Sequence, residues 1–256
     1  MSPYIQIQPF KTLLKNSWEL YRGNFTYLMS VFLPLYMVLV LLQIVQAQQF
    51  AVPMQQLALG GDLAGFYKIF LFFFVIMISL EVLLNIVLLK TIGELCKGNH
   101  GSLTAIYREA IKKYFLPLLW VSFLVGILVM LGLGLLIIPG LIFLAWYVLA
   151  CPAAVMEDLR GWEALKRSKE LGRGSYVRNL GILFLPLLIL IPLVSMIQFW
   201  MLDPNEIHHV AGLGEILLSG LITALVTPYW HGLIILLYFD MKARKEGAVE
   251  PPVEGL

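Results

Sequence analysis

The chain has 256 residues, of which 60% are hydrophobic and only 13% are charged, about half the charged fraction of a typical soluble domain. A water-soluble protein of this length could not cover its surface with so few polar groups, so the composition excludes a soluble enzyme and predicts an integral membrane protein. The 18 basic and 16 acidic residues are too evenly balanced for nucleic-acid binding, which requires a concentrated basic surface. Two cysteines, Cys96 and Cys151, cannot form a disulfide framework and are predicted to be unpaired thiols.

Long uncharged stretches predict an all-α membrane protein with six transmembrane helices, because crossing the hydrocarbon core takes about 20 apolar residues. The run from Tyr114 to Met156 contains 43 residues without a charge. As a single helix it would be about 64 Å long, twice the thickness of the hydrocarbon core. It must therefore fold back on itself, and Gly132, Gly134 and the Pro139-Gly140 pair are the predicted place for the turn. The predicted spans lie near 25–47, 69–89, 114–137, 141–156, 180–201 and 216–239.

The positions of lysine and arginine indicate the orientation of these spans. All basic residues except Lys68, 17 of 18, fall before the first span, in alternate connections or after the last span. Because positively charged loops stay in the cytoplasm, both termini are predicted to be cytoplasmic. Residues 1–247 are predicted to form one membrane domain, followed by a disordered cytoplasmic tail at 248–256.

Three charged segments, near 9–22, 102–113 and 161–172, carry apolar residues at helical spacing and are predicted to be amphipathic helices. The three apolar faces are Phe10, Leu13, Leu14, Ser17, Trp18 and Tyr21; Leu103, Ile106, Tyr107, Ala110, Ile111 and Tyr114, with Ser102 as N-cap; and Ala164, Leu165, Ser168 and Leu171. Such faces either lie among lipid headgroups, helped by anionic lipid, or pack on the ends of the spans, and the sequence leaves both open. The candidate contacts to lipid headgroups or to a partner are Lys11, Lys15, Arg22, Arg108, Lys112, Lys113, Lys166 and Arg167.

An internal repeat is indicated by two of these segments. Residues 17–23 and 168–174 are identical at five of seven positions, and Leu33-Pro34-Leu35 corresponds to Leu185-Pro186-Leu187 further along. Both copies place an amphipathic helix and a glycine before a span that contains proline. We therefore predict three parallel units, each an interfacial helix followed by a transmembrane hairpin, with the middle unit the most diverged.

Several short motifs resemble a known family. They are Ile138-Pro139-Gly140-Leu141-Ile142, Pro152, Glu157, Gly161, the run from Ala164 to Ser168, and the ending from Leu237 to Gly247. In these positions, and over roughly residues 10 to 247, the chain resembles the YciC-like bacterial inner-membrane proteins and the membrane domain attached to some glycerophosphoryl diester phosphodiesterases. The resemblance implies a multi-pass protein of the bacterial inner membrane and brings no active site with it.

Glu81 is the strongest candidate for a functional residue, because placing a carboxylate within a span costs free energy unless the group is paired or protonated. Asn85 lies one turn later on the same helix face. Counted back from the cytoplasmic ends of their spans, Glu81 and His231 lie at a similar depth, so we predict a contact between them. A structural hydrogen bond between helices is favoured over a pathway for protons or polar solutes.

No cofactor or catalytic residue is predicted, because no nucleophile–base pattern or phosphate-binding loop is recognisable. Asp203, Glu206, His208 and His209 could hold a metal, but a solvated loop is favoured. The predicted role is a non-enzymatic membrane scaffold, or a module that binds lipid or a partner, with a homo-oligomer or a membrane protein as candidate partners. The alternative is a small transporter or channel with its polar site at Glu81, Asn85 and His231.

Overall fold

The computed structural model describes residues 4–58, 63–201 and 213–247, and within these ranges the chain is helical with no strand. The helices are α1 (Phe10–Gly23), α2 (Phe25–Ala58), α3 (Leu63–Cys96), α4 (Leu103–Glu109), the π-helix η1 (Ala110–Tyr114), α5 (Phe115–Leu135), α6 (Ile137–Tyr147), α7 (Ala150–Met156), α8 (Trp162–Gly172), α9 (Tyr176–Met201) and α10 (Leu213–Glu246). The predicted tail at 248–256 and the candidate metal residues Asp203, Glu206, His208 and His209 lie outside the described residues.

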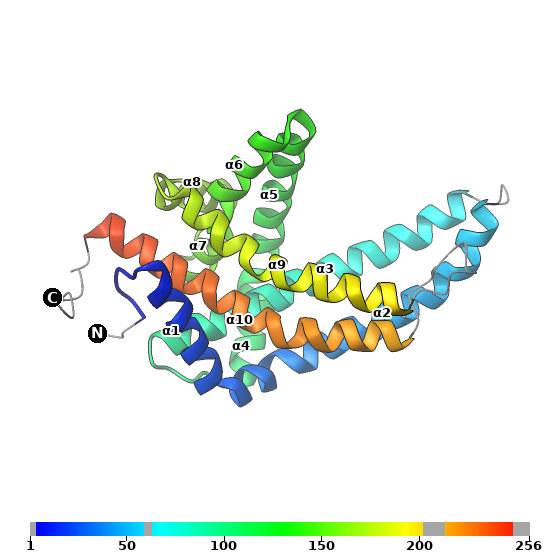
Figure 1. Cartoon of the computed structure of the whole chain (residues 1–256), viewed down its shortest axis with the longest axis horizontal. Helices are drawn as coiled ribbons and strands as arrows, with labels where there is room; N and C mark the ends of the chain where they lie inside the picture. Colours follow the sequence, from blue (N-terminus) through cyan, green and yellow to red (C-terminus); the bar gives the residue numbers. More distant parts are fainter. Residues whose placement is uncertain (1–3, 59–62, 202–212, 248–256) are drawn as a thin grey trace.

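Helix α10 is at the centre of the molecule and contacts α1, α2, α3, α7, α8 and α9. Its segment from His231 to Met241 is buried throughout. Two tyrosine hydroxyls donate to its backbone, from Tyr21 to the carbonyl of Leu225 and from Tyr36 to the carbonyl of Gly220, both at 2.9 Å. These bonds hold α1 and α2 in register along α10. The start of α1 and the end of α10 lie at the same end of the molecule, here named the charged end (Figure 1).

Five helical stretches within the described residues are long and apolar enough to cross a membrane. They are Phe25–Phe50, Leu63–Cys96, Leu103–Leu135, Ile138–Met156 and Leu213–Glu246. The predicted span at 180–201 lies inside α9. The chain is therefore an all-α protein with several candidate membrane spans, as its composition predicts.

The long uncharged run does fold back on itself, at Leu136, which is extended between α5 and α6. Gly132 and Gly140 face each other across this turn, so closely that an added Cβ on Gly132 would lie 2.9 Å from the Cα of Gly140. Pro139 falls in the first turn of α6, where its missing N–H leaves no backbone bond unmade. Gly132 and Gly140, which the sequence predicts in the turn, therefore form the contact between the antiparallel helices α5 and α6. The turn itself is at Leu136.

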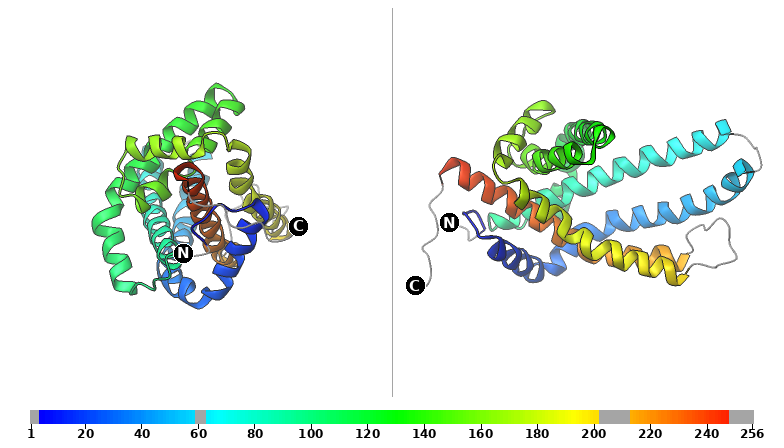
Figure 2. Two further views of the ribbon diagram at one scale, coloured as in Figure 1. Left: turned by 90° about the vertical axis from the view of Figure 1, so that its left-hand side faces the viewer. Right: turned by 45° about the horizontal axis from the view of Figure 1, so that its top comes forward.

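The hairpins do not all point the same way. The α2–α3 hairpin lies beside α9 and α10 and extends in the same direction, whereas the α5–α6 hairpin leaves them at an angle (Figure 1). The two further views show the same divergence (Figure 2). As a result, much of the apolar surface of α5 faces outward, including Leu116, Trp120 and Phe123.

Helices are present at all three places where the charged segments predict them. Ser102 is the N-cap of α4 and accepts a hydrogen bond from the backbone N–H of Ala105 at 3.3 Å, as expected. The buried residues of α8 include the whole predicted stripe of Ala164, Leu165, Ser168 and Leu171. The π-helix η1, which joins α4 to α5, is not predicted by the sequence pattern.

Candidate functional site at the charged end

Glu157 is the most highly connected carboxylate at the charged end. It follows the last turn of α7 and accepts two hydrogen bonds from Arg167 of α8, from Nε at 2.8 Å and from Nη2 at 3.0 Å. From α10 it accepts the hydroxyl of Tyr238 at 2.6 Å and the ammonium of Lys242 at 2.9 Å. Arg167 also pairs with Glu246 at the end of α10. These five residues, the Glu157 network, join α7, α8 and α10.

The surroundings of Glu157 keep it ionised. Burial of the carboxylate acts to raise its pKa, but the hydrogen bonds from Arg167, Tyr238 and Lys242 more than offset burial and lower the pKa to about 2. The pKa of Arg167 is raised by its hydrogen bond to Glu157, so the guanidinium stays charged. The side chain of Glu157 is 17% exposed and that of Arg167 is 22% exposed, so water screens their attraction less than that of a surface pair.

This low pKa predicts that the protein loses stability in acid. Glu157 titrates at 4.5 in the unfolded chain and at about 2 in the folded protein. Its contribution of about 3 kcal/mol is therefore complete above pH 4.5 and is lost as the pH falls from 4.5 towards 2. Unfolding by dodecyl sulfate in mixed micelles, followed at several pH values, measures this loss. The stability difference between the native chain and Glu157→Gln should shrink over that interval, and a difference independent of pH would contradict the prediction.

Asp240 forms a second network on the adjoining face of α10. Its side chain is completely buried and pairs with Arg178 of α9 at 2.9 Å and with Arg244 one turn later at 3.0 Å. It also accepts the backbone N–H of Gln8 at 2.6 Å. Both arginines donate in turn to the carbonyl of Gln8, at 2.8 and 3.1 Å. This Asp240 network therefore fixes the segment that precedes α1 against the start of α9 and the end of α10.

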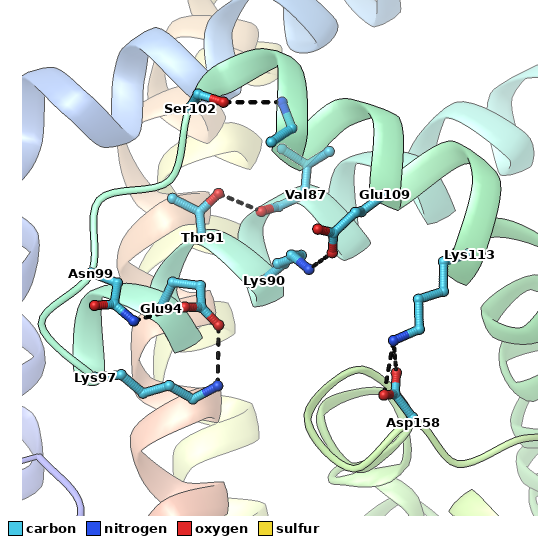
Figure 3. Close-up of polar contacts among 11 residues, drawn as sticks. Val87, Lys90, Thr91, Glu94, Lys97, Asn99, Ser102, Glu109, Lys113 and Asp158 are labelled. Atoms are coloured by element: carbon cyan, nitrogen blue, oxygen red, sulfur yellow. Dashed lines mark hydrogen bonds and ion pairs between the residues drawn. The ribbon is translucent and has the colours of Figure 1, made fainter.

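Two ion pairs fix the segment between α3 and α5 (Figure 3). Lys90 of α3 pairs with Glu109 of α4. Lys113 of η1 donates to Asp158 at 2.8 Å, which connects this segment to the loop after α7. Asp158 adopts a left-handed backbone conformation with φ of 55°, and its hydrogen bond from Lys113 lowers its pKa. Because both side chains are about half exposed, this pair is expected to contribute little stability.

The eight basic residues predicted to contact lipid or a partner divide into two groups. Three form ion pairs: Arg167 in the Glu157 network, Lys113 with Asp158, and Lys15 with Glu19 in an exposed pair at 3.7 Å. The other five are exposed and have no ion pair with any described residue; they are Lys11, Arg22, Arg108, Lys112 and Lys166. The second group is the one that remains available for an external anion.

Glu81 and His231 have different surroundings. Glu81 is exposed on α3, and its carboxylate is close enough to Tyr36 of α2 for the two side chains to interact electrostatically. His231 is buried on α10, and its Nδ1 donates to the carbonyl of Thr227 in its own helix at 2.8 Å. Within the described part of the chain the two residues form no hydrogen bond or ion pair with each other. The buried Oδ1 of Asn85 has no hydrogen-bond partner there.

Several residues of the two networks are not found by reasoning from the sequence. Asp240, Arg178 and Lys242 are examples, because each contacts a partner far away along the chain: Lys242 and Glu157 are 85 residues apart. One signal in the sequence could have indicated Asp240. An acidic residue near the end of an apolar helix requires a neighbouring cation if it is buried. Cys96 and Cys151 are free thiols, as predicted. Among the described residues no group of three or more metal-ligating side chains comes together.

Taken together, the geometry at the charged end is that of satisfied ion pairs between helices, surrounded by exposed cations. Asp240, which is buried, and Glu157, which is partly buried, each accept from several donors and are structural acceptors, so the exposed lysines and arginines remain for binding. Comparison with known proteins adds no assignment: no protein-family model, no curated protein and no solved structure matches the chain.

Proposed function

We propose that the chain is a non-enzymatic, multi-pass protein of the bacterial inner membrane that binds anionic lipid headgroups at its charged end and so acts as a membrane scaffold. Six spans with both termini in the cytoplasm fit the alternation of basic and uncharged segments. The resemblance to the YciC-like inner-membrane proteins and the three-unit repeat belong to the same proposal. In this arrangement α1, α4 and α8 lie at the cytoplasmic surface of the bilayer.

The observation that carries the proposal is the group of five exposed cations without ion pairs. Lys11, Arg22, Arg108, Lys112 and Lys166 are exposed and form no ion pair with a described residue, whereas the acidic residues Glu157 and Asp240 are already neutralised by other cations. Each lysine or arginine near an anionic surface contributes about 1 kcal/mol to membrane attraction. Exposed Phe10, Trp18 and Trp162 on α1 and α8 add apolar and aromatic contacts of the kind found at membrane interfaces.

The test is lipid selectivity after reconstitution. The protein is placed in nanodiscs made from equal parts of phosphatidylglycerol and phosphatidylethanolamine, and the lipids retained after gentle release are counted by native mass spectrometry. We expect enrichment of phosphatidylglycerol, falling at least about tenfold when the five cations are replaced by glutamine. Replacing the exposed Glu163 and Glu170 by glutamine is the matched control and should not reduce the enrichment. Equal retention of both lipids by the native chain would contradict the proposal.

A second candidate function, a small transporter, is favoured by the polar groups of α3. Glu81 is a carboxylate in a candidate span, and the buried oxygen of the neighbouring Asn85 has no hydrogen-bond partner among the described residues. Polar groups of this kind within spans mark ion or proton pathways. In proteoliposomes that contain a pH-sensitive dye, a transporter would carry protons and Glu81→Gln would abolish the flux. A native chain that carries none would rule this candidate out.

A further inference from the structure

A long apolar groove lies between α3 and α5, where the α5–α6 hairpin diverges from the rest of the helices. Its volume is about 1160 Å³. One wall is formed by Phe74, Ile78 and Ser79 of α3, and the other by Trp120, Phe123 and Gly126 of α5. Phe74, Ile78, Trp120 and Phe123 are all more than a third exposed. The groove is therefore open towards the side of the bundle, where the bilayer lies if both helices are spans.

The length of the groove fits an acyl chain. On α5 it extends from Leu116 to Leu131, which is about 22 Å along a helix that rises 1.5 Å per residue. One leaflet of the hydrocarbon core is about 15 Å thick. A phospholipid whose headgroup lies at the charged end can therefore place a whole acyl chain in the groove.

The end of the groove near Leu116 is basic. Lys112, in the π-helix η1, precedes Leu116 by four residues, about one helical turn, and its neighbour Lys113 donates to Asp158, next to Glu157 at the charged end. Lys112 is exposed and has no ion pair among the described residues, whereas its neighbour Lys113 is paired with Asp158. Arg160, also exposed and without an ion pair there, lies beside this end, because the adjacent Gly161 packs against the indole of Trp120.

We infer that this groove is a specific site for one anionic phospholipid, with an acyl chain between α3 and α5 and the phosphate at Lys112 and Arg160. The inference rests on the proposed function and names the lipid site within it. A second copy of the chain is a poorer occupant. A twofold axis along the membrane normal would bring the Lys112 and Arg160 side chains of both copies to the same end, where like charges repel.

The test fills the groove without disturbing the core. An added Cβ at Gly126 meets nothing within 4 Å, and the same holds for Gly134 on the same helix, which does not line the groove. We therefore compare Gly126→Phe with Gly134→Phe in the phosphatidylglycerol nanodisc experiment. Gly126→Phe should remove one tightly held lipid per chain, and Gly134→Phe should retain it. Lys112→Gln should weaken the retention of phosphatidylglycerol about fivefold, with less effect on phosphatidylethanolamine.

The outcomes separate this inference from the proposed function. If the native chain enriches phosphatidylglycerol but Gly126→Phe and Gly134→Phe retain equal amounts, the groove is not the lipid site, while the proposed function stands. If the native chain shows no enrichment, the proposed function fails as well. If Gly126→Phe instead converts a dimer to a monomer in the same spectra, the groove is an interface between copies of the chain, and the lipid inference is overturned.

Discussion

Replacing Asp240 with alanine is expected to destabilise the protein by about 3–5 kcal/mol, the usual cost of removing one partner of a buried ion pair. The carboxylate is fully buried, and it is the anion that pairs with both Arg178 and Arg244. Without it, two guanidinium groups lose the anion that neutralises them, and the backbone N–H of Gln8 loses its acceptor. Unfolding by dodecyl sulfate in mixed micelles measures the loss of stability.

A second readout separates the specific effect from a general loss of folding. Because Asp240, Arg178 and Arg244 hold the backbone of Gln8, the substitution should free the segment before α1. Trypsin should then cleave at Lys11 or Lys15 under conditions in which the native chain resists cleavage. Glu19→Ala is the control, since its pair with Lys15 is exposed and loose, and it should change the stability by less than about 0.5 kcal/mol. Equal effects of the two substitutions would show that Asp240 is not a fixed anchor.

Glu157→Ala is expected to destabilise the protein by about 3 kcal/mol, the low end of the range for a buried pair, because the carboxylate is only partly buried. It removes the shared acceptor of Arg167, Tyr238 and Lys242, and Arg167 keeps its pair with Glu246. The expected consequence is a loosened contact of α8 with α10. Hydrogen exchange measured on peptides from residues 162–172 should show this as faster exchange.

The neighbouring residue supplies a matched control. Asp158 also accepts a hydrogen bond from a lysine, Lys113, but the carboxylate is 57% exposed, so Asp158→Asn should cost no more than about 1 kcal/mol. Asparagine is used because it tolerates the left-handed backbone of this position. Compared with Glu157→Gln, this substitution removes the same charge from the adjacent position, and the two carboxylates differ in burial and in the number of their donors. A cost for Asp158→Asn as large as that for Glu157→Gln would mean that neither difference sets the strength of these pairs.

The positions of the helices could be predicted from the sequence because they depend on local patterns. The uncharged run after Tyr114 is longer than one membrane crossing, and the structure folds it into the α5–α6 hairpin. The apolar stripe of Ala164, Leu165, Ser168 and Leu171 is buried as expected. Hydrophobic spacing contains this information directly, since each face of a helix repeats every three or four residues.

The contacts between distant segments could not be predicted in the same way. The bond between Gln8 and Asp240 joins residues 232 positions apart, and no periodicity relates them. The contact of Glu81 with His231 is predicted by counting back from the cytoplasmic ends of two predicted spans, which spacing alone does not place at the same level, and it stays a prediction. The structure gives His231 a partner in its own helix, the carbonyl of Thr227. The angle of the α5–α6 hairpin, which opens the groove, is likewise not contained in any local pattern.

The threading of the chain through the bilayer can be tested most directly by cysteine labelling from one side. In a chain with Cys96 and Cys151 replaced by serine, single cysteines are introduced by Lys15→Cys, Lys245→Cys and Lys68→Cys, and intact spheroplasts are treated with a membrane-impermeant maleimide. Six crossings with a cytoplasmic charged end require labelling at position 68 only, and labelling at 15 and 245 after permeabilisation. Labels at 15 and 245 on opposite sides, or at 68 on the same side as both, would contradict this arrangement.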